Sequence, residues 1–386
     1  MGFEQFLGNE RIVTSLRGML RTDRVPSAVA FLGPRGIGKY TLARMFAMAA
    51  NCERLRDDFC GECDTCRGIA LLAEPAELVQ RGLAERGESG DAEKIPLILQ
   101  THPDVWAIVP DPMRLNTPVV RPVLHMGQLR AVERAARFRP GARRRVFIMD
   151  GADTMRWDIA NIFLKILEEA PATTTIVMLA QSRNQLLPTI VSRCVPFEFA
   201  PVQAEEMESL LKAHTKLDAA SRARAAEMAE GSPGAAIGMD VERIFEIRKQ
   251  ALKLLQLAAT EKSSLLFGLT TQITKKDAVP FENLLDALYS VLADLLELTS
   301  RGGAKTAASS TMRDGNDRKP AANAEDIRIL LRNPGLKKEL QELASTVNTD
   351  WVARAVRGVD KLASGQRRNI NRQLALDSLG LSLSAR

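Results

Sequence analysis

The chain has 386 residues, 45% of them hydrophobic and 26% charged, which is enough apolar material for the cores of about two or three domains. Its formal net charge of +6 reflects 53 Lys and Arg against 47 Asp and Glu, a mild excess that permits nucleic-acid contact without demonstrating it. No apolar run is long enough to span a bilayer and no signal-peptide layout is present, so the sequence argues against a membrane protein and predicts a cytoplasmic location.

A phosphate-binding loop follows the first predicted strand. Ala28–Leu32 is a short continuous apolar run, typical of a buried parallel strand, and residues 42–50 are helix formers without a breaker. Between them, residues 33–39 read Gly-x-x-x-x-Gly-Lys, whose glycines let backbone N–H groups surround a phosphate. This strand–loop–helix context predicts a P-loop fold and argues against a chance glycine-rich turn. The predicted nucleotide-site residues are Gly33, Gly36, Gly38, Lys39, Thr41 and Asp150.

Four cysteines follow the P-loop helix with the spacing C-x7-C-x2-C-x2-C; they are Cys52, Cys60, Cys63 and Cys66. In a cytosolic protein, clustered cysteines indicate a metal site rather than disulfides. Four thiolates close a tetrahedral shell around Zn²⁺ and leave no open position, so we expect a structural zinc site without catalysis. An iron–sulfur cluster is the alternative, since C-x2-C-x2-C also occurs in ferredoxin-like runs, but no proline follows the last cysteine.

Further strands are predicted at residues 105–109, 146–149, 174–180 and, at a sheet edge, 195–199, alternating with helices as in a parallel sheet. Asp150 ends the second of these strands, where P-loop ATPases position Mg²⁺. The catalytic parts around it are incomplete. Tyr40 stands where a Ser or Thr hydroxyl should hold Mg²⁺, and Thr41 is one residue late, rotated by about 100° around the helix. Gly151 replaces the Glu that polarises water, so we expect no self-catalysed ATP hydrolysis.

Arg193 follows a short predicted helix at residues 188–192, after the fourth strand of the core. Its simplest interpretation is a surface arginine. An arginine at this position of a P-loop core can also extend into a neighbouring subunit's nucleotide site and stabilise charge on the transferred phosphoryl group.

From residue 201 the sequence becomes helical, and no strand is predicted beyond residue 235. Residues 302–324, rich in Ala, Ser, Gly and charge, predict a flexible loop. The helices are predicted at residues 3–21, 126–138, 158–169, 188–192, 205–213, 219–230, 241–257, 281–298, 325–331, 337–362 and 368–381.

The order of these motifs resembles a known family. After the P-loop and the cysteines come Thr-His-Pro-Asp at 101–104, Asp-Gly-Ala-Asp at 150–153, Asn-Ile-Phe-Leu-Lys-Ile-Leu-Glu-Glu-Ala-Pro at 161–171 and Ser-Arg-Cys at 192–194. This is similar to the clamp-loader subunits of bacterial DNA polymerase III, which belong to the AAA+ class, and most closely to their delta-prime members. The resemblance covers about residues 3–238 and returns faintly at 369–376.

The resemblance implies an α/β fold with an AAA+ P-loop core at residues 1–200, including the zinc module at 52–66. A small helical lid at 201–240 and an all-α collar at 241–386 would follow. It implies a non-hydrolysing scaffold subunit that supplies Arg193 as an arginine finger in trans to a neighbouring gamma/tau ATPase. Implied partners are gamma/tau and delta in a hetero-oligomeric ring, with the sliding clamp and primed DNA reached through the complex. ATP binding by its own site is doubtful on this view.

The lid motif reads Gly-Ser-Pro-Gly at 231–234, without the arginine of active gamma/tau members, and this difference agrees with the delta-prime type. One departure and two alternatives remain. The departure is the long stretch between Cys66 and Thr101, in which we expect residues 72–98 to be an insertion of unknown role. The first alternative is a divergent gamma/tau-type ATPase that uses Thr41 for Mg²⁺ and another carboxylate as base. The second is a zinc-dependent nucleic-acid-binding protein.

Overall fold

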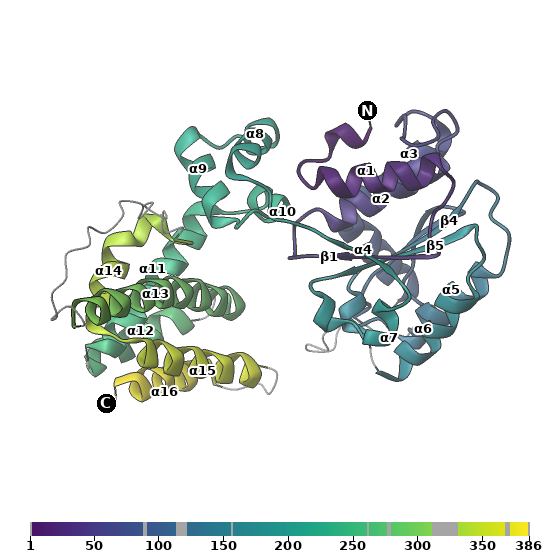
Figure 1. Cartoon of the computed structure of the whole chain (residues 1–386). Coiled ribbons are helices and arrows are strands. Elements are labelled where there is room, and N and C mark those ends of the chain that lie inside the picture. The colour runs from purple at the N-terminus through teal and green to yellow at the C-terminus, as the bar shows by residue number, and fades with distance from the viewer. Residues whose placement is uncertain are drawn as a thin grey trace. The chain divides into compact units, whose positions relative to one another are not determined.

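The computed structural model describes residues 2–87, 91–112, 122–155, 157–260, 262–275, 279–310, 331–366 and 371–384. The chain forms two compact units, coloured along the sequence in Figure 1. The first contains Met1–Lys216 and Gly231–Ile237, and the second contains Leu217–Glu230 and Gly238–Arg386. The chain therefore leaves the first unit, returns to it for one short helix, and then completes the second.

The first unit is built on a six-stranded sheet in the order β2-β3-β4-β5-β1-β6. Every neighbouring pair is parallel except β2 and β3, which confirms the predicted parallel core and the edge position of β6. The antiparallel β2 was not predicted, because its sequence Leu-Gln-Thr-His has no apolar run. The strands are β1 (Ala28–Leu32), β2 (Leu99–His102), β3 (Val105–Ile108), β4 (Arg145–Met149), β5 (Thr174–Ala180) and β6 (Val195–Glu198).

Helices cover both faces of this sheet (Figure 1). Val29 and Phe31 of β1 face a core shared with α1 and α2, whereas Ala28 and Ala30 face a core shared with α5 and α6. Because alternate residues of a strand point to opposite faces, burial on both sides explains the unbroken apolar sequence of β1. The helices of this unit are α1 (Glu10–Arg21), α2 (Lys39–Asn51), α3 (Asp64–Ala70), α4 (Pro75–Arg86), α5 (Met126–Ala136), α6 (Trp157–Glu169), α7 (Pro188–Val191), α8 (Ala204–His214) and α10 (Pro233–Ile237), with 3-10 turns η1 (Phe3–Gln5), η2 (Leu71–Ala73), η3 (Ala152–Thr154) and η4 (Arg183–Gln185).

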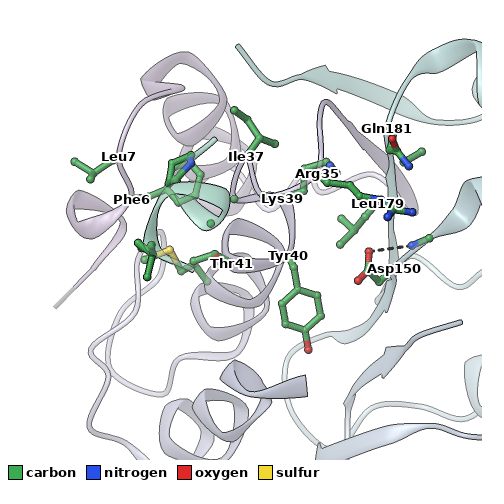
Figure 2. Close-up of a pocket in the computed structure, with 18 of the residues that line it drawn as sticks. Phe6, Leu7, Arg35, Ile37, Lys39, Tyr40, Thr41, Asp150, Leu179 and Gln181 are labelled. Atoms are coloured by element: carbon green, nitrogen blue, oxygen red, sulfur yellow. Dashed lines mark hydrogen bonds between the residues drawn. The ribbon is translucent and has the colours of Figure 1, made fainter. Parts of the chain in front are cut away.

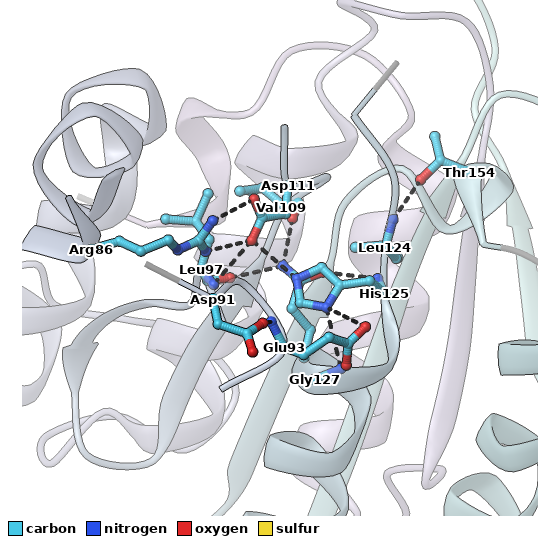
Figure 3. A network of polar contacts seen from close by, with 11 residues as sticks. Arg86, Asp91, Glu93, Leu97, Val109, Asp111, Leu124, His125, Gly127 and Thr154 are labelled. Atoms are coloured by element: carbon cyan, nitrogen blue, oxygen red, sulfur yellow. Dashed lines mark hydrogen bonds and ion pairs between the residues drawn. The ribbon is translucent and has the colours of Figure 1, made fainter. Parts of the chain in front are cut away.

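The segment at residues 72–98, which we predict to be an insertion, is joined to the chain that follows β3 by a buried polar network (Figure 3). Arg86 ends α4, and its Nη1 and Nη2 donate to the two carboxylate oxygens of Asp111 at 2.9 and 2.5 Å. His125 Nε2 lies 3.0 Å from Asp111 Oδ2, and Gln128 Nε2 donates to the carbonyl of Leu97 at 2.8 Å. All four network side chains are buried, so this network stabilises the placement of this segment.

We expect Asp111→Ala to lower the free energy of unfolding by about 3–5 kcal/mol, because it leaves the buried Arg86 guanidinium without its counter-charge. Urea denaturation of the full chain measures this loss. The matched control is Glu133→Ala, which removes the more exposed ion pair with Arg137 and is expected to cost less than about 1 kcal/mol. Equal losses in the two variants would contradict a structural role for the network.

The second unit is entirely helical in its described part, and helices α11 to α16 share one apolar core. Asp294 of α13 accepts hydrogen bonds from the backbone N–H groups of Arg332 and Asn333 at 2.8 and 2.9 Å, which fixes the chain where it re-enters this core. Within the described residues, no helix combines the length and apolar character needed to cross a membrane. The helices are α9 (Ala219–Met228), α11 (Val241–Ala259), α12 (Ser263–Thr274), α13 (Phe281–Ser310), α14 (Lys337–Thr346), α15 (Thr349–Gln366) and α16 (Arg372–Ser384), with η5 (Pro334–Leu336).

Three predictions for this unit need correction. The predicted loop at residues 302–324 is wrong at its start, because α13 continues to Ser310; the rest of that loop lies outside the described residues. The helix predicted at 337–362 is two helices, separated where Val347 adopts an extended conformation. Helix α12 was missed, because Gly268 and several Thr residues weaken its helical propensity.

Candidate functional site

The P-loop connects β1 to α2 and has the backbone conformation that its glycines allow. Gly36 and Gly38 have φ angles of +74° and +101°, in the left-handed region that favours glycine. A Cβ on Gly36 would lie 2.9 Å from the backbone nitrogen of Ala235. The start of α10 contacts the loop directly, since Gly234 N–H donates to the Gly36 carbonyl at 2.8 Å and Ser232 Oγ donates to the Arg35 carbonyl at 3.1 Å.

Lys39 is the first residue of α2, directly after this loop. Its Nζ donates to the carbonyls of Gly33 and Pro34 at 2.6 and 2.7 Å. Burial lowers the pKa of Lys39, and the carboxylates of Asp150 and Asp153 oppose that shift. Lys39 and Asp150, which follow β1 and β4, thus line the same cavity, as the order of the motifs indicates.

A cavity of about 860 Å³ opens in front of the loop, within the size range of small-molecule sites (Figure 2). Its wall includes five predicted residues, namely Gly36, Gly38, Lys39, Thr41 and Asp150. Its apolar wall was not predicted, because scattered apolar side chains form no motif. That wall includes Phe6, Leu7, Ile37, Leu210 and Ile237.

Tyr40 does not replace the missing magnesium ligand. Figure 2 shows its phenol extending away from Arg35 and Lys39, and its hydroxyl donates to the carbonyl of Leu72 at 3.0 Å. Burial raises the pKa of Tyr40, so the hydroxyl stays a neutral phenol. Neutral phenols are absent from the oxygen ligands that Mg²⁺ prefers in such sites.

The acidic side of the site also departs from a hydrolytic centre. Asp150 Oδ1 accepts a hydrogen bond from Gly151 N–H at 2.9 Å, and burial raises the pKa of the Asp150 carboxyl. Gly151 has no side chain that could orient water. Positions 40 and 151 therefore lack the side chains that complete the catalytic centre of a P-loop ATPase, whereas Thr41 and Asp150 line the cavity.

The four cysteines gather into one cluster. Their Sγ atoms all lie within 4.8 Å of one another, and none forms a disulfide. Tetrahedral zinc with Zn–S bonds of about 2.3 Å would need sulfur separations of about 3.8 Å, which small shifts from this arrangement supply. The donor set therefore fits a four-thiolate metal ion. The ligands would be Cys52, Cys60, Cys63 and Cys66.

Backbone N–H groups already point at these sulfurs. Cys60 Sγ accepts from the N–H groups of Glu62 and Cys63 at 3.5 and 3.3 Å, and Cys63 Sγ accepts from Cys66 N–H at 3.4 Å. The two bonds from Glu62 and Cys63 lower the pKa of Cys60 to about 6, whereas burial raises the pKa of Cys66. Donors of this kind favour thiolates, the form in which cysteine binds metal.

Arg193 lies on the turn between α7 and β6, and the cavity wall does not include it. Its Nε and Nη2 contact Glu168 Oε1 at 2.7 and 2.6 Å, and its Nη1 donates to the Thr189 carbonyl at 3.0 Å. The side chain is 39% exposed. The guanidinium is therefore held on the surface by a residue of α6 and a residue of α7.

The P-loop after β1, the acidic residue at the end of β4 and the strand order define a P-loop core of the AAA+ class. The family model described as "DNA polymerase III, delta subunit" matches residues 8–203, just over half of the chain. The chain therefore belongs to this family of DNA polymerase III clamp-loader subunits.

Relatives of two kinds match the chain. DNA polymerase III subunit tau of Bacillus subtilis is 26% identical over 205 residues, 53% of this chain and 30% of tau, so the chain spans under a third of that protein. Subunit delta' of B. subtilis is 24% identical over 293 residues, 75% of this chain and 77% of delta'. Among solved structures, a DNA polymerase III gamma subunit-related protein of Thermotoga maritima has a TM-score of 0.41 at 14% identity, covering 97% of this chain and 99% of that one.

Proposed function

We propose that the chain is a delta-prime-type subunit of the DNA polymerase III clamp loader. It acts as a non-hydrolysing scaffold and supplies Arg193 in trans to the nucleotide site of a neighbouring gamma/tau ATPase. The observation that carries this proposal is the hydrogen bond of Tyr40. Residue 40 is the sequence position whose hydroxyl holds Mg²⁺ in a P-loop ATPase, but here that hydroxyl donates to the Leu72 carbonyl. Gly151, in place of the residue that polarises water, is an independent second loss.

The surface geometry of Arg193 supports the in-trans role. A guanidinium carries five N–H donors. Glu168 accepts from Nε and from one N–H of Nη2, and the Thr189 carbonyl accepts from one N–H of Nη1. One N–H on each of Nη1 and Nη2 is therefore left for another acceptor. Two N–H groups in this fork arrangement match the oxygens of a phosphate.

The organisation of the complex follows from the same proposal. The core at residues 1–200, the lid at 201–240 and the collar at 241–386 join a hetero-oligomeric ring with gamma/tau and delta subunits. The sliding clamp and primed DNA are reached through that ring, in the cytoplasm. Zinc bound by the four cysteines has a structural role, because four thiolates leave no open coordination position.

We expect the isolated chain to show no ATP turnover above background, and Lys39→Ala to leave that background unchanged, because neither the magnesium hydroxyl nor the base is present. Phosphate release by the purified full chain measures this, with a gamma/tau subunit as the positive control. Turnover that Lys39→Ala abolishes would instead identify a divergent gamma/tau-type ATPase.

A further inference from the structure

The cavity combines an intact phosphate loop with a tyrosine at the position that supplies the magnesium hydroxyl in a P-loop ATPase, and this tyrosine donates to Leu72 instead. We propose that this cavity binds a nucleoside diphosphate without a divalent cation. The protein's own N–H groups and cationic side chains supply the positive charge that Mg²⁺ supplies in a P-loop ATPase. A third phosphate adds no affinity. This inference concerns the chain's own site and does not depend on the role of Arg193.

The loop is held in its binding shape by the chain itself. The carbonyls of Arg35 and Gly36 are bound by Ser232 and Gly234. Because a trans peptide directs its N–H opposite to its C=O, the N–H groups of Gly36 and Ile37 point away from α10. Within the described chain, no N–H from Gly36 to Thr41 donates to a protein acceptor. These donors stand at the start of α2, a helix of 13 residues, where its dipole favours an anion.

Two cations complete the phosphate end of the cavity. Lys39 uses two of its three N–H donors on the carbonyls of Gly33 and Pro34, so one donor is left for a phosphate oxygen. Arg35 lines the same cavity and is exposed. Charge-assisted hydrogen bonds from such groups are roughly twice as strong as neutral ones. A diphosphate therefore meets positive charge and free N–H groups without a metal.

Two carboxylates in the cavity wall explain why a third phosphate adds no binding affinity. Asp150 and Asp153 line the cavity, and no metal ligand at position 40 places a cation between them and the ligand. An added phosphate brings more negative charge toward these carboxylates. The motif at residues 231–234 carries no compensating arginine, since Gly234 stands at that position and a Cβ there would lie 3.1 Å from the Gly36 carbonyl oxygen.

The apolar part of the cavity wall suits a base rather than a bare anion. It includes Phe6 and Leu7 from the N-terminal segment, Ile37 from the loop and Ile237 from α10. Figure 2 shows Phe6 and Leu7 on the side of the cavity away from Asp150. Apolar side chains stack on or enclose a nucleobase, and such walls are typical of small-molecule sites. The cavity therefore joins an anion-binding end to an apolar end, as a nucleotide requires.

The test measures equilibrium binding of ADP and of ATP to the full chain by calorimetry, with MgCl₂ and then with EDTA. We expect the Kd for ADP to agree within about twofold in the two buffers, and ATP to bind no more tightly than ADP. Lys39→Ala should weaken ADP binding about 10- to 100-fold. Lys165→Ala, an exposed lysine of α6, is the matched control. Binding that requires Mg²⁺, or no ADP binding at all, would overturn the proposal.

A second pair of variants tests the cause. Tyr40→Thr places a hydroxyl at the magnesium position and should make ATP binding about tenfold tighter with Mg²⁺ than with EDTA. Tyr40→Phe removes only the hydrogen bond to Leu72, and its affinity for ATP should be the same with Mg²⁺ as with EDTA. Far-UV circular dichroism checks that each variant is folded. If Tyr40→Thr also ignores Mg²⁺, Tyr40 is not the reason for metal-free binding and the assignment is wrong. A failure of either experiment leaves the in-trans role of Arg193 untouched.

Discussion

Arg193→Ala is expected to slow ATP hydrolysis about a thousandfold at the one nucleotide site that this arginine faces in a reconstituted clamp loader. The loss is large because an arginine finger stabilises charge that develops on the transferred phosphoryl group only in the transition state. Pre-steady-state phosphate release from the chain mixed with gamma/tau and delta subunits measures it, as the disappearance of one fast phase. Arg193→Lys should restore little, because lysine lacks the planar fork of donors.

The fold should not change in this variant. Arg193 is exposed and its pair with Glu168 is a surface ion pair, worth less than about 1 kcal/mol. Glu168→Ala keeps the Arg193 guanidinium but removes the carboxylate that holds it in place, so we expect the rate of ATP hydrolysis to fall about tenfold or less. Arg137→Ala is the matched control, because Arg137 is also an exposed arginine paired with a glutamate. Unchanged hydrolysis in Arg193→Ala would remove the in-trans role.

The sequence predicted those features that local pattern determines. The unbroken apolar runs identified β1, β4 and β5, because strands covered on both faces carry no polar positions. The P-loop and the four cysteines were found because their chemistry requires fixed spacing. The structure places the cysteine sulfurs together as that spacing indicates.

Contacts between distant segments were beyond sequence reasoning. The bond from Tyr40 to Leu72 and the ion pair from Arg86 to Asp111 join residues 32 and 25 positions apart, and no periodicity relates them. The contact of Gly234 with Gly36 joins α10 to the P-loop across almost 200 residues, and helix α10 itself was not predicted. Each of these contacts depends on how the sheet brings its connections together.

Loss of the cysteine cluster is expected to destabilise the chain more than any surface substitution. We expect the purified chain to contain stoichiometric zinc, and Cys66→Ala to release it with a loss of stability of about 5 kcal/mol or more, since metal-binding energy is folding energy in such modules. Cys52, Cys63 and Cys66 are part of the same apolar core as α1 and α2, so the loss extends into the P-loop unit. Metal analysis and thermal unfolding of both proteins measure the two effects.

The fifth cysteine provides the control for this experiment. Cys194 lies outside the cluster, and its thiol donates to the Ile190 carbonyl at 3.1 Å. Cys194→Ala should therefore retain zinc and cost about 1 kcal/mol, the value of a neutral hydrogen bond. Iron with acid-labile sulfide in the purified chain would identify the alternative cluster, because those are the components that four cysteines hold in a ferredoxin-like site. Zinc retained after replacement of all four cysteines would show that the metal is bound elsewhere, since that variant has none of the thiolates of this cluster.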